Sequence, residues 1–95
     1  MGCATGYLGH ALRKAGFQNI YGIESHREWA ELAKPSYHEV AICDLEANSF
    51  PWSEKKFNAI VCADILEHLR DPLQVLKQLT SLAKTSGWIL VSLPN

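Results

Sequence analysis

The 95-residue sequence has no long apolar segment, no block of like charges and no paired cysteine motif. A membrane-spanning helix needs about 20 consecutive apolar residues, and no run in this sequence approaches that length. Nine lysines and arginines nearly balance ten aspartates and glutamates, which disfavours a nucleic-acid interface or a polybasic membrane patch. The N-terminus also lacks the charged and then apolar segments of a secretory signal. We therefore expect a soluble protein that neither spans a membrane nor is secreted.

The cysteines are few and widely spaced, at positions 3, 43 and 62. An odd number without a C-x-x-C pair cannot form a closed disulfide framework, so a reducing, cytoplasmic setting is expected. Apolar residues make up 47% and charged residues 20% of the chain, which is typical of a globular domain. At 10.6 kDa, the chain is long enough for one small core, and we expect a single domain over residues 1–95.

The hydrophobic pattern predicts a helix, a strand, a helix, two strands, a helix and a strand, in that order. Strands that alternate with helices and are nearly apolar throughout favour an α/β fold, with a parallel sheet covered by helices on both faces. The predicted helices lie between Gly6 and Ala15, between Ser25 and Pro35, and between Asp71 and Gly87, and the predicted strands cover residues 19–24, 38–43, 57–63 and 88–93.

Two of the predicted helices carry capping signals. Ser25 and Glu28 have the spacing of a capping box, which predicts Ser25 as the N-cap of the second helix. Asp71 precedes Pro72, a residue that is tolerated at the first helical position, so Asp71 is predicted to cap the third helix. Gly87 is predicted to end that helix.

Residues 2–9 contain three glycines and lead directly into the first predicted helix. The first amides of a helix lack intrahelical partners and face its positive end, and small residues let a ligand approach the backbone closely. A nucleotide cradle and a simple tight turn both remain open here, because a glycine pattern alone is a weak signal.

A carboxylate closes each of three predicted strands, namely Glu24, Asp44 and Asp64. Ligands of open α/β sheets bind at the carboxyl ends of the strands, so we expect these acids on one rim beside the glycine loop. Glu24 lies about twenty residues beyond the loop, where a carboxylate can accept hydrogen bonds from ribose hydroxyls. The alternative for Glu24 is a surface acid at the start of the second helix.

The other reactive side chains carry weaker signals. His68 follows Glu67 and is a candidate general base, although both residues also suit a turn between a strand and a helix. Cys43 and Cys62 lie in predicted strands, where small core residues are expected. No metal site is predicted, since the remaining histidines have no partner at metal-ligand spacing: His10, His26 and His38.

Several segments together resemble the motifs of class I S-adenosylmethionine-dependent methyltransferases. The resemblance is in order and spacing, it covers essentially the whole chain, and the D-x-x-E-H stretch after the third predicted strand is its most telling part. It implies a Rossmann-like, doubly wound parallel sheet and S-adenosylmethionine as the cofactor. The segments concerned are residues 2–9, 23–24, 43–46, 63–69 and 87–95.

The resemblance also implies roles for individual residues. Glu24 would hold the ribose hydroxyls, Asp44 would accept from the exocyclic amine of adenine, and the backbone amide of Leu45 would meet the adenine ring. Backbone atoms of five residues would line or border the methionine portion: Gly2, Cys3, Gly6, Ala63 and Asp64. The cofactor carries the difficult chemistry, so no protein nucleophile is expected.

The chain departs from the family pattern at its beginning. Ala4 replaces the middle glycine of the loop, and the strand that normally precedes the loop, with its terminal acid, is absent. That central strand would lie between the first and third strands of this chain, and the family's later strands would lie beyond Asn95. We therefore expect residues 1–95 to form a partial S-adenosylmethionine-binding domain.

The expected function is methyl transfer to an unknown small-molecule acceptor. An NAD-dependent oxidoreductase is one alternative, because Ala4, Gly6 and Gly9 together with Glu24 also approximate a dinucleotide-binding fingerprint. A non-catalytic truncated fragment is another.

Overall fold

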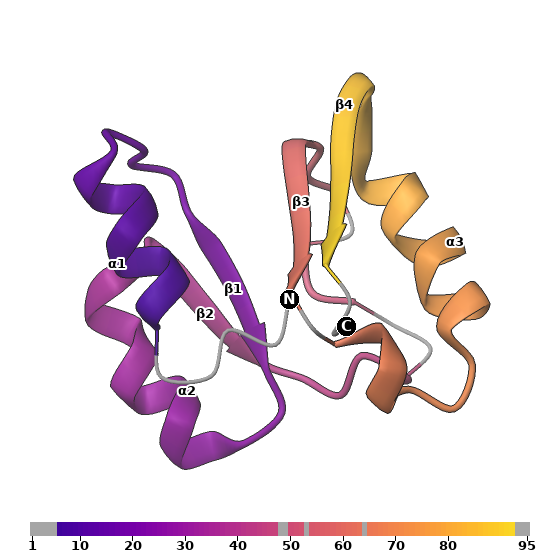
Figure 1. Cartoon of the computed structure of the whole chain (residues 1–95), viewed down its shortest axis with the longest axis horizontal. Helices are drawn as coiled ribbons and strands as arrows, with labels where there is room; N and C mark the ends of the chain where they lie inside the picture. Colours follow the sequence, from indigo (N-terminus) through magenta and orange to yellow (C-terminus); the bar gives the residue numbers. More distant parts are fainter. Residues whose placement is uncertain (1–5, 48–49, 53, 64, 93–95) are drawn as a thin grey trace. The chain divides into compact units, whose positions relative to one another are not determined.

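The computed structural model describes residues 6–47, 50–52, 54–63 and 65–92. The chain divides into two compact units. We call them the N-terminal unit, Gly2–Asp44, and the C-terminal unit, which is chiefly Leu45–Asn95. Figure 1 shows the helices and strands of both units.

In the N-terminal unit, two helices lie beside a pair of parallel strands (Figure 1). Strands β1 and β2 pair in the register Tyr21↔Glu39 to Glu24↔Ile42, and α2 packs against both. The buried core consists of Ile20, Ala33 and Tyr37, with Leu12 and Val40 packed around it. The elements are α1 (Tyr7–Lys14), β1 (Tyr21–Glu24), α2 (Arg27–Ala33), the short 3-10 helix η1 (Lys34–Ser36) and β2 (Glu39–Ile42).

The start of α2 differs from the prediction. The N-cap is His26 and not Ser25, because the Nδ1 of His26 accepts a hydrogen bond from the Trp29 amide at 3.4 Å. The carboxylate of Glu24 in turn accepts from the His26 amide at 2.8 Å. A side chain from the preceding strand thus organises the turn, so the helix begins one residue later than a Ser25 cap requires.

In the C-terminal unit, α3 packs against a second pair of parallel strands (Figure 1). The strands pair from Ala59↔Trp88 to Ala63↔Ser92, with an irregularity between Phe57 and Ala59. The elements are β3 (Phe57–Ala63), the 3-10 helix η2 (Leu66–His68), α3 (Pro72–Leu82) and β4 (Ala83–Ser92). The core gathers one face of β3 and the apolar stripe of α3: Ile60, Cys62, Val75, Leu79 and Leu82.

The two ends of α3 test the capping predictions separately. Asp71 is the N-cap, as predicted, and accepts a hydrogen bond from the Gln74 amide at 3.2 Å. The predicted end at Gly87 is wrong, since the helix stops at Leu82 and Ala83 is already extended and paired with Phe57. The helix ends at the buried Leu82, and the polar residues Lys84, Thr85 and Ser86 do not extend its apolar stripe.

The observed order of elements and the parallel pairing confirm the predicted α/β organisation. Among the described residues the four strands form two separate two-stranded sheets, β1–β2 and β3–β4, and not one continuous sheet. Within the described ranges, no helix has the length and apolar character needed to cross a membrane.

Candidate functional site

Two of the three predicted rim carboxylates lie at the same end of one strand pair. Glu24 is the last residue of β1 and pairs with Ile42, the last residue of β2. The amide of Cys43 donates to the carbonyl oxygen of Glu24 at 3.1 Å, so Asp44 follows directly at this end. The third acid, Asp64, lies outside the described residues.

Glu24 and Asp44 differ sharply in environment. Glu24 is only 6% exposed, and its Oε2 accepts from the His26 amide at 2.8 Å. The His26 ring stacks on Trp29 with 4.5 Å between the ring centroids, which further orders the turn. Asp44 is exposed. The strand pair therefore presents one held, buried carboxylate and one solvated carboxylate, both suited to accept hydrogen bonds from a ligand.

Packing within the N-terminal unit requires glycine at Gly6 and Gly9, the two glycines of the predicted loop that the structure describes. Gly6 is the N-cap of α1 with a φ of 97°, and a Cβ there would lie 2.9 Å from the Cα of Ala33. A Cβ on Gly9 would lie 2.3 Å from the ring of Tyr37. Both positions thus need glycine whether or not a ligand binds. The predicted Gly2 and Cys3 contacts fall outside the described residues.

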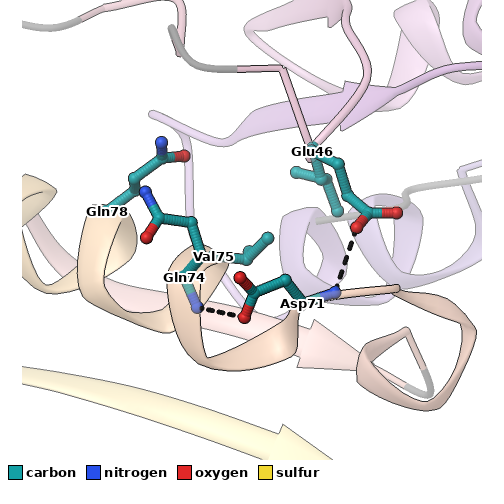
Figure 2. A pocket seen from close by; sticks show the side chains of 6 residues that line it. Glu46, Asp71, Gln74, Val75 and Gln78 are labelled. Carbon is teal, nitrogen blue, oxygen red and sulfur yellow. Dashed lines mark hydrogen bonds between the residues drawn. The ribbon is translucent and has the colours of Figure 1, made fainter.

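In the C-terminal unit, the predicted residue Leu45 is buried at 6% exposure and lines a pocket of about 180 Å³. Figure 2 shows this pocket from close by, with polar side chains of α3 on one side and Glu46 on the other. Gln78 contributes an Oε1 that is buried and has no hydrogen-bond partner within the described residues. The pocket is lined by Leu45, Glu46, Asp71, Gln74, Val75 and Gln78.

Sequence reasoning did not anticipate the role of Glu46 in this region. Its Oε2 accepts from the backbone amides of both Arg70 and Asp71, at 2.9 and 3.1 Å. The available signal was a second acid two positions after Asp44, but its partners are 24 and 25 residues away. Local pattern does not reveal such partners.

The structure places the remaining predicted residues near the end of β3. Ala63 is its last residue and is exposed. His68 lies in η2 with 72% of its side chain exposed, and its Nε2 is 3.5 Å from Oε1 of Glu67. A polar contact of a side chain this exposed contributes little to stability, so the two residues form a solvent-accessible feature of the turn.

The described cysteine thiols are poorly suited to act as nucleophiles. Burial raises the pKa of the Cys62 thiol above its ordinary value of 9.0. Burial, and secondarily the charge of Asp44, raises the pKa of the Cys43 thiol as well. The reactive thiolate is therefore disfavoured at neutral pH, and Cys62 belongs to the core of its unit, as predicted.

Comparison with known proteins gives consistent matches over the whole chain. A family model described as a methyltransferase domain matches residues 1–95. The chain is 31% identical over 104 residues to a ubiquinone biosynthesis O-methyltransferase of Haemophilus ducreyi, and 29% identical over 104 residues to the protein of that name from Bordetella pertussis. These alignments cover 100% of this chain but 44% and 41% of the two relatives. The chain therefore spans less than half of their length.

Solved structures share the fold at lower sequence identity. The plantazolicin methyltransferase BpumL, crystallised with S-adenosylhomocysteine (SAH) and a pentazolic desmethylPZN analog, has a TM-score of 0.78 at 19% identity, over 95% of this chain and 35% of that one. The PH0226 protein of Pyrococcus horikoshii has a TM-score of 0.83 at 20% identity, over 99% of this chain and 44% of that one. The predicted Rossmann-like α/β class is thereby confirmed.

Proposed function

The chain belongs to the methyltransferase domain family, and from this premise we propose that it is the S-adenosylmethionine-binding core of a methyltransferase that acts on a small molecule. The observation that carries the proposal is the position of Glu24 and Asp44 at the carboxyl ends of two adjacent parallel strands. That is where open α/β sheets bind nucleoside ligands.

The donor and acceptor chemistry of this end suits a nucleoside. In the proposal, Glu24 accepts hydrogen bonds from the ribose hydroxyls, and the His26 amide keeps its carboxylate oriented. Asp44 accepts from the exocyclic amine of adenine, and Leu45 offers its backbone amide to the ring. Carboxylates are the strongest hydrogen-bond acceptors among the side chains, so hydroxyl and amine donors match them.

The methionine portion is assigned to backbone atoms of small residues. Gly6 and Ala63 are the members of that set within the described residues, and Gly2, Cys3 and Asp64 complete it by sequence. Gly6 stands at the start of α1 in a left-handed conformation, and because glycine has no side chain its backbone can be approached closely. All five are proposed contacts of the methionine portion.

The acceptor is proposed to be a hydroxyl compound, because the curated relatives are named O-methyltransferases. When bound, S-adenosylmethionine supplies an activated methyl group. The chain has to align the acceptor and remove its proton. We assign His68 to this second task. Glu67 beside Nε2 favours a proton on that nitrogen, which leaves Nδ1 to accept the proton of the hydroxyl.

Both units are proposed to belong to one partial cofactor domain over residues 1–95, since the family match runs through both. The reducing, cytoplasmic setting is retained as part of the proposal on the cysteine pattern. The oxidoreductase alternative gains no support from the family model or from the curated relatives.

Isothermal titration of the chain with SAH and with NAD tests the proposed function. SAH has the same nucleoside and methionine-derived groups as the cofactor but cannot transfer a methyl group, so it reports binding alone. We expect SAH to bind and NAD to bind weakly or not at all. Binding of NAD without binding of SAH would refute the assignment.

A further inference from the structure

One carboxylate oxygen in the C-terminal unit connects two segments that are far apart in sequence. Oε2 of Glu46 accepts hydrogen bonds from the amides of Arg70, at 2.9 Å, and of Asp71, at 3.1 Å. Figure 2 shows the bond to Asp71 beside the Asp71 cap of α3. Charge-assisted bonds of this length are at the strong end of the range for protein hydrogen bonds.

The two amides lie where backbone donors lack partners. Arg70 and Asp71 directly precede Pro72, the first residue of α3, and the amides around a helix start have no intrahelical acceptor. The carboxylate of Asp71 is already engaged by the Gln74 amide. Glu46 therefore supplies the second anion at the positive end of the helix, and it does so from a different segment.

Glu46 connects two segments to which the proposed function assigns roles, one toward adenine and one toward the acceptor. On one side it follows Leu45, which is 6% exposed and lines the same pocket. On the other side, Arg70 stands two residues after His68. The intervening chain is tightly turned, because the His68 amide donates to the Ile65 carbonyl at 3.0 Å and the Leu69 amide to the Leu66 carbonyl at 3.2 Å. A displacement of residues 70–71 would therefore be transmitted to His68.

We propose that Glu46 is a positioning residue, which holds the segment 65–71 that carries His68 in a fixed position against Leu45. The inference rests on the proposed function, in which Leu45 contacts adenine and His68 serves the acceptor. What it adds is that the Glu46 carboxylate fixes the position of His68, which is assigned to the acceptor, relative to Leu45, which is assigned to adenine.

The experiment compares Glu46→Ala, Glu46→Gln and the control Glu54→Ala in the same chain. Glu54 is an exposed acid of the same unit, so its removal makes the same change in charge. Hydrogen exchange at the Arg70 and Asp71 amides reports the contact directly, and titration with SAH reports its effect on binding.

In Glu46→Ala we expect exchange at the two amides to accelerate roughly tenfold or more and SAH to bind about threefold to tenfold more weakly. Glu46→Gln retains a carbonyl acceptor and should restore most of the protection and most of the affinity. Glu54→Ala should change neither quantity.

Asp71→Ala separates positioning from general stability, because it removes the cap of α3 and leaves the backbone bonds to Glu46 in place. It should lower the melting temperature and affect SAH affinity less than Glu46→Ala does. An equal loss of affinity would overturn the proposal, as would unchanged exchange at residues 70–71 in Glu46→Ala. Unchanged SAH affinity despite faster exchange would overturn the link to the cofactor. If the unsubstituted chain does not bind SAH, the proposed function fails, and the exchange measurement still decides whether Glu46 holds the segment.

Discussion

Replacing Glu24 by glutamine isolates the carboxylate that the proposed function assigns to the ribose. Glutamine has nearly the same shape and keeps one carbonyl oxygen, which can still accept from the His26 amide. Its NH2 group replaces the second carboxylate oxygen and cannot accept a hydrogen bond. The turn between β1 and α2 should therefore persist, while the ability to accept from two hydroxyls is lost.

The expected magnitude follows from the charge and burial of this side chain. Glu24 is 6% exposed, so water cannot readily replace a lost partner. A hydrogen bond to a charged group contributes about 1.5–3 kcal/mol, against about 0.5–1.5 kcal/mol for a neutral pair. Neutralising an acceptor of two hydroxyls should thus weaken SAH binding by about 2 kcal/mol, or roughly 30-fold in Kd.

The assay is titration calorimetry with SAH at fixed salt and pH, with thermal denaturation of the unliganded variants to verify folding. Glu28→Gln is the matched control, since Glu28 is an exposed acid in the first turn of α2 and its neutralisation makes the same change in charge. We expect Glu28→Gln to alter Kd by less than about twofold, in line with the small effects of exposed charges.

Two results would refute the reasoning. An unchanged Kd for SAH in Glu24→Gln would show that Glu24 does not contact the nucleoside. An equal loss in Glu28→Gln would show that the net charge of this region, and not the buried carboxylate, governs affinity. Glu24→Ala is a less clean test, because it also leaves the His26 amide without its carboxylate acceptor and should destabilise the fold.

Three further predictions concern packing and protonation. Gly9→Ala would place a Cβ 2.3 Å from the ring of Tyr37. The cost of this clash should exceed the gain of about 1 kcal/mol in helix propensity, so the free energy of unfolding should fall by about 1–2 kcal/mol in total. Urea denaturation measures this free energy, and an unchanged value would contradict the contact between Gly9 and Tyr37. Leu79→Ala removes a side chain that is 0% exposed and should cost about 2–5 kcal/mol in the same assay, whereas Leu73→Ala, at 61% exposure, should cost about 0.5 kcal/mol or less. Burial raises the pKa of the Cys62 thiol above 9.0 in the folded chain, so the unfolded chain loses this proton at a lower pH. The free energy of unfolding should therefore fall as the pH rises past 9.0. If Cys62→Ala showed the same fall with pH, the Cys62 thiol would not be its source.

The sequence predicted the local features of the fold well where a single segment contains all the information. The Asp71–Pro72 pair was enough to place the start of α3, because an N-cap acts on amides two or three residues away. The same reasoning failed at Ser25, since the Glu24 side chain reorganises that turn from the preceding strand. It failed again at Gly87, because pairing of Ala83 with Phe57 begins the strand earlier than the glycine suggests.

The candidate site shows the same division. The sequence identified Glu24 and Asp44 as acids that close strands, and parallel pairing of β1 with β2 brings them to one end. The burial of Glu24 and the exposure of Asp44 could not be predicted from the pattern, because in the sequence each acid simply closes a short apolar segment. Which of them is enclosed depends on the helices that pack around the strands.

By itself, the sequence determined the order of helices and strands, their parallel pairing and the family motifs. These features follow from hydrophobic periodicity, connection length and motif spacing, which depend only on the order of residues along the chain. Only the tertiary structure decided that Glu46 holds the amides of Arg70 and Asp71, that His26 caps α2 and that Gly9 lies against Tyr37. These contacts depend on which groups meet once the backbone has folded. The sequence around a carboxylate or a glycine does not indicate which distant residue it will contact.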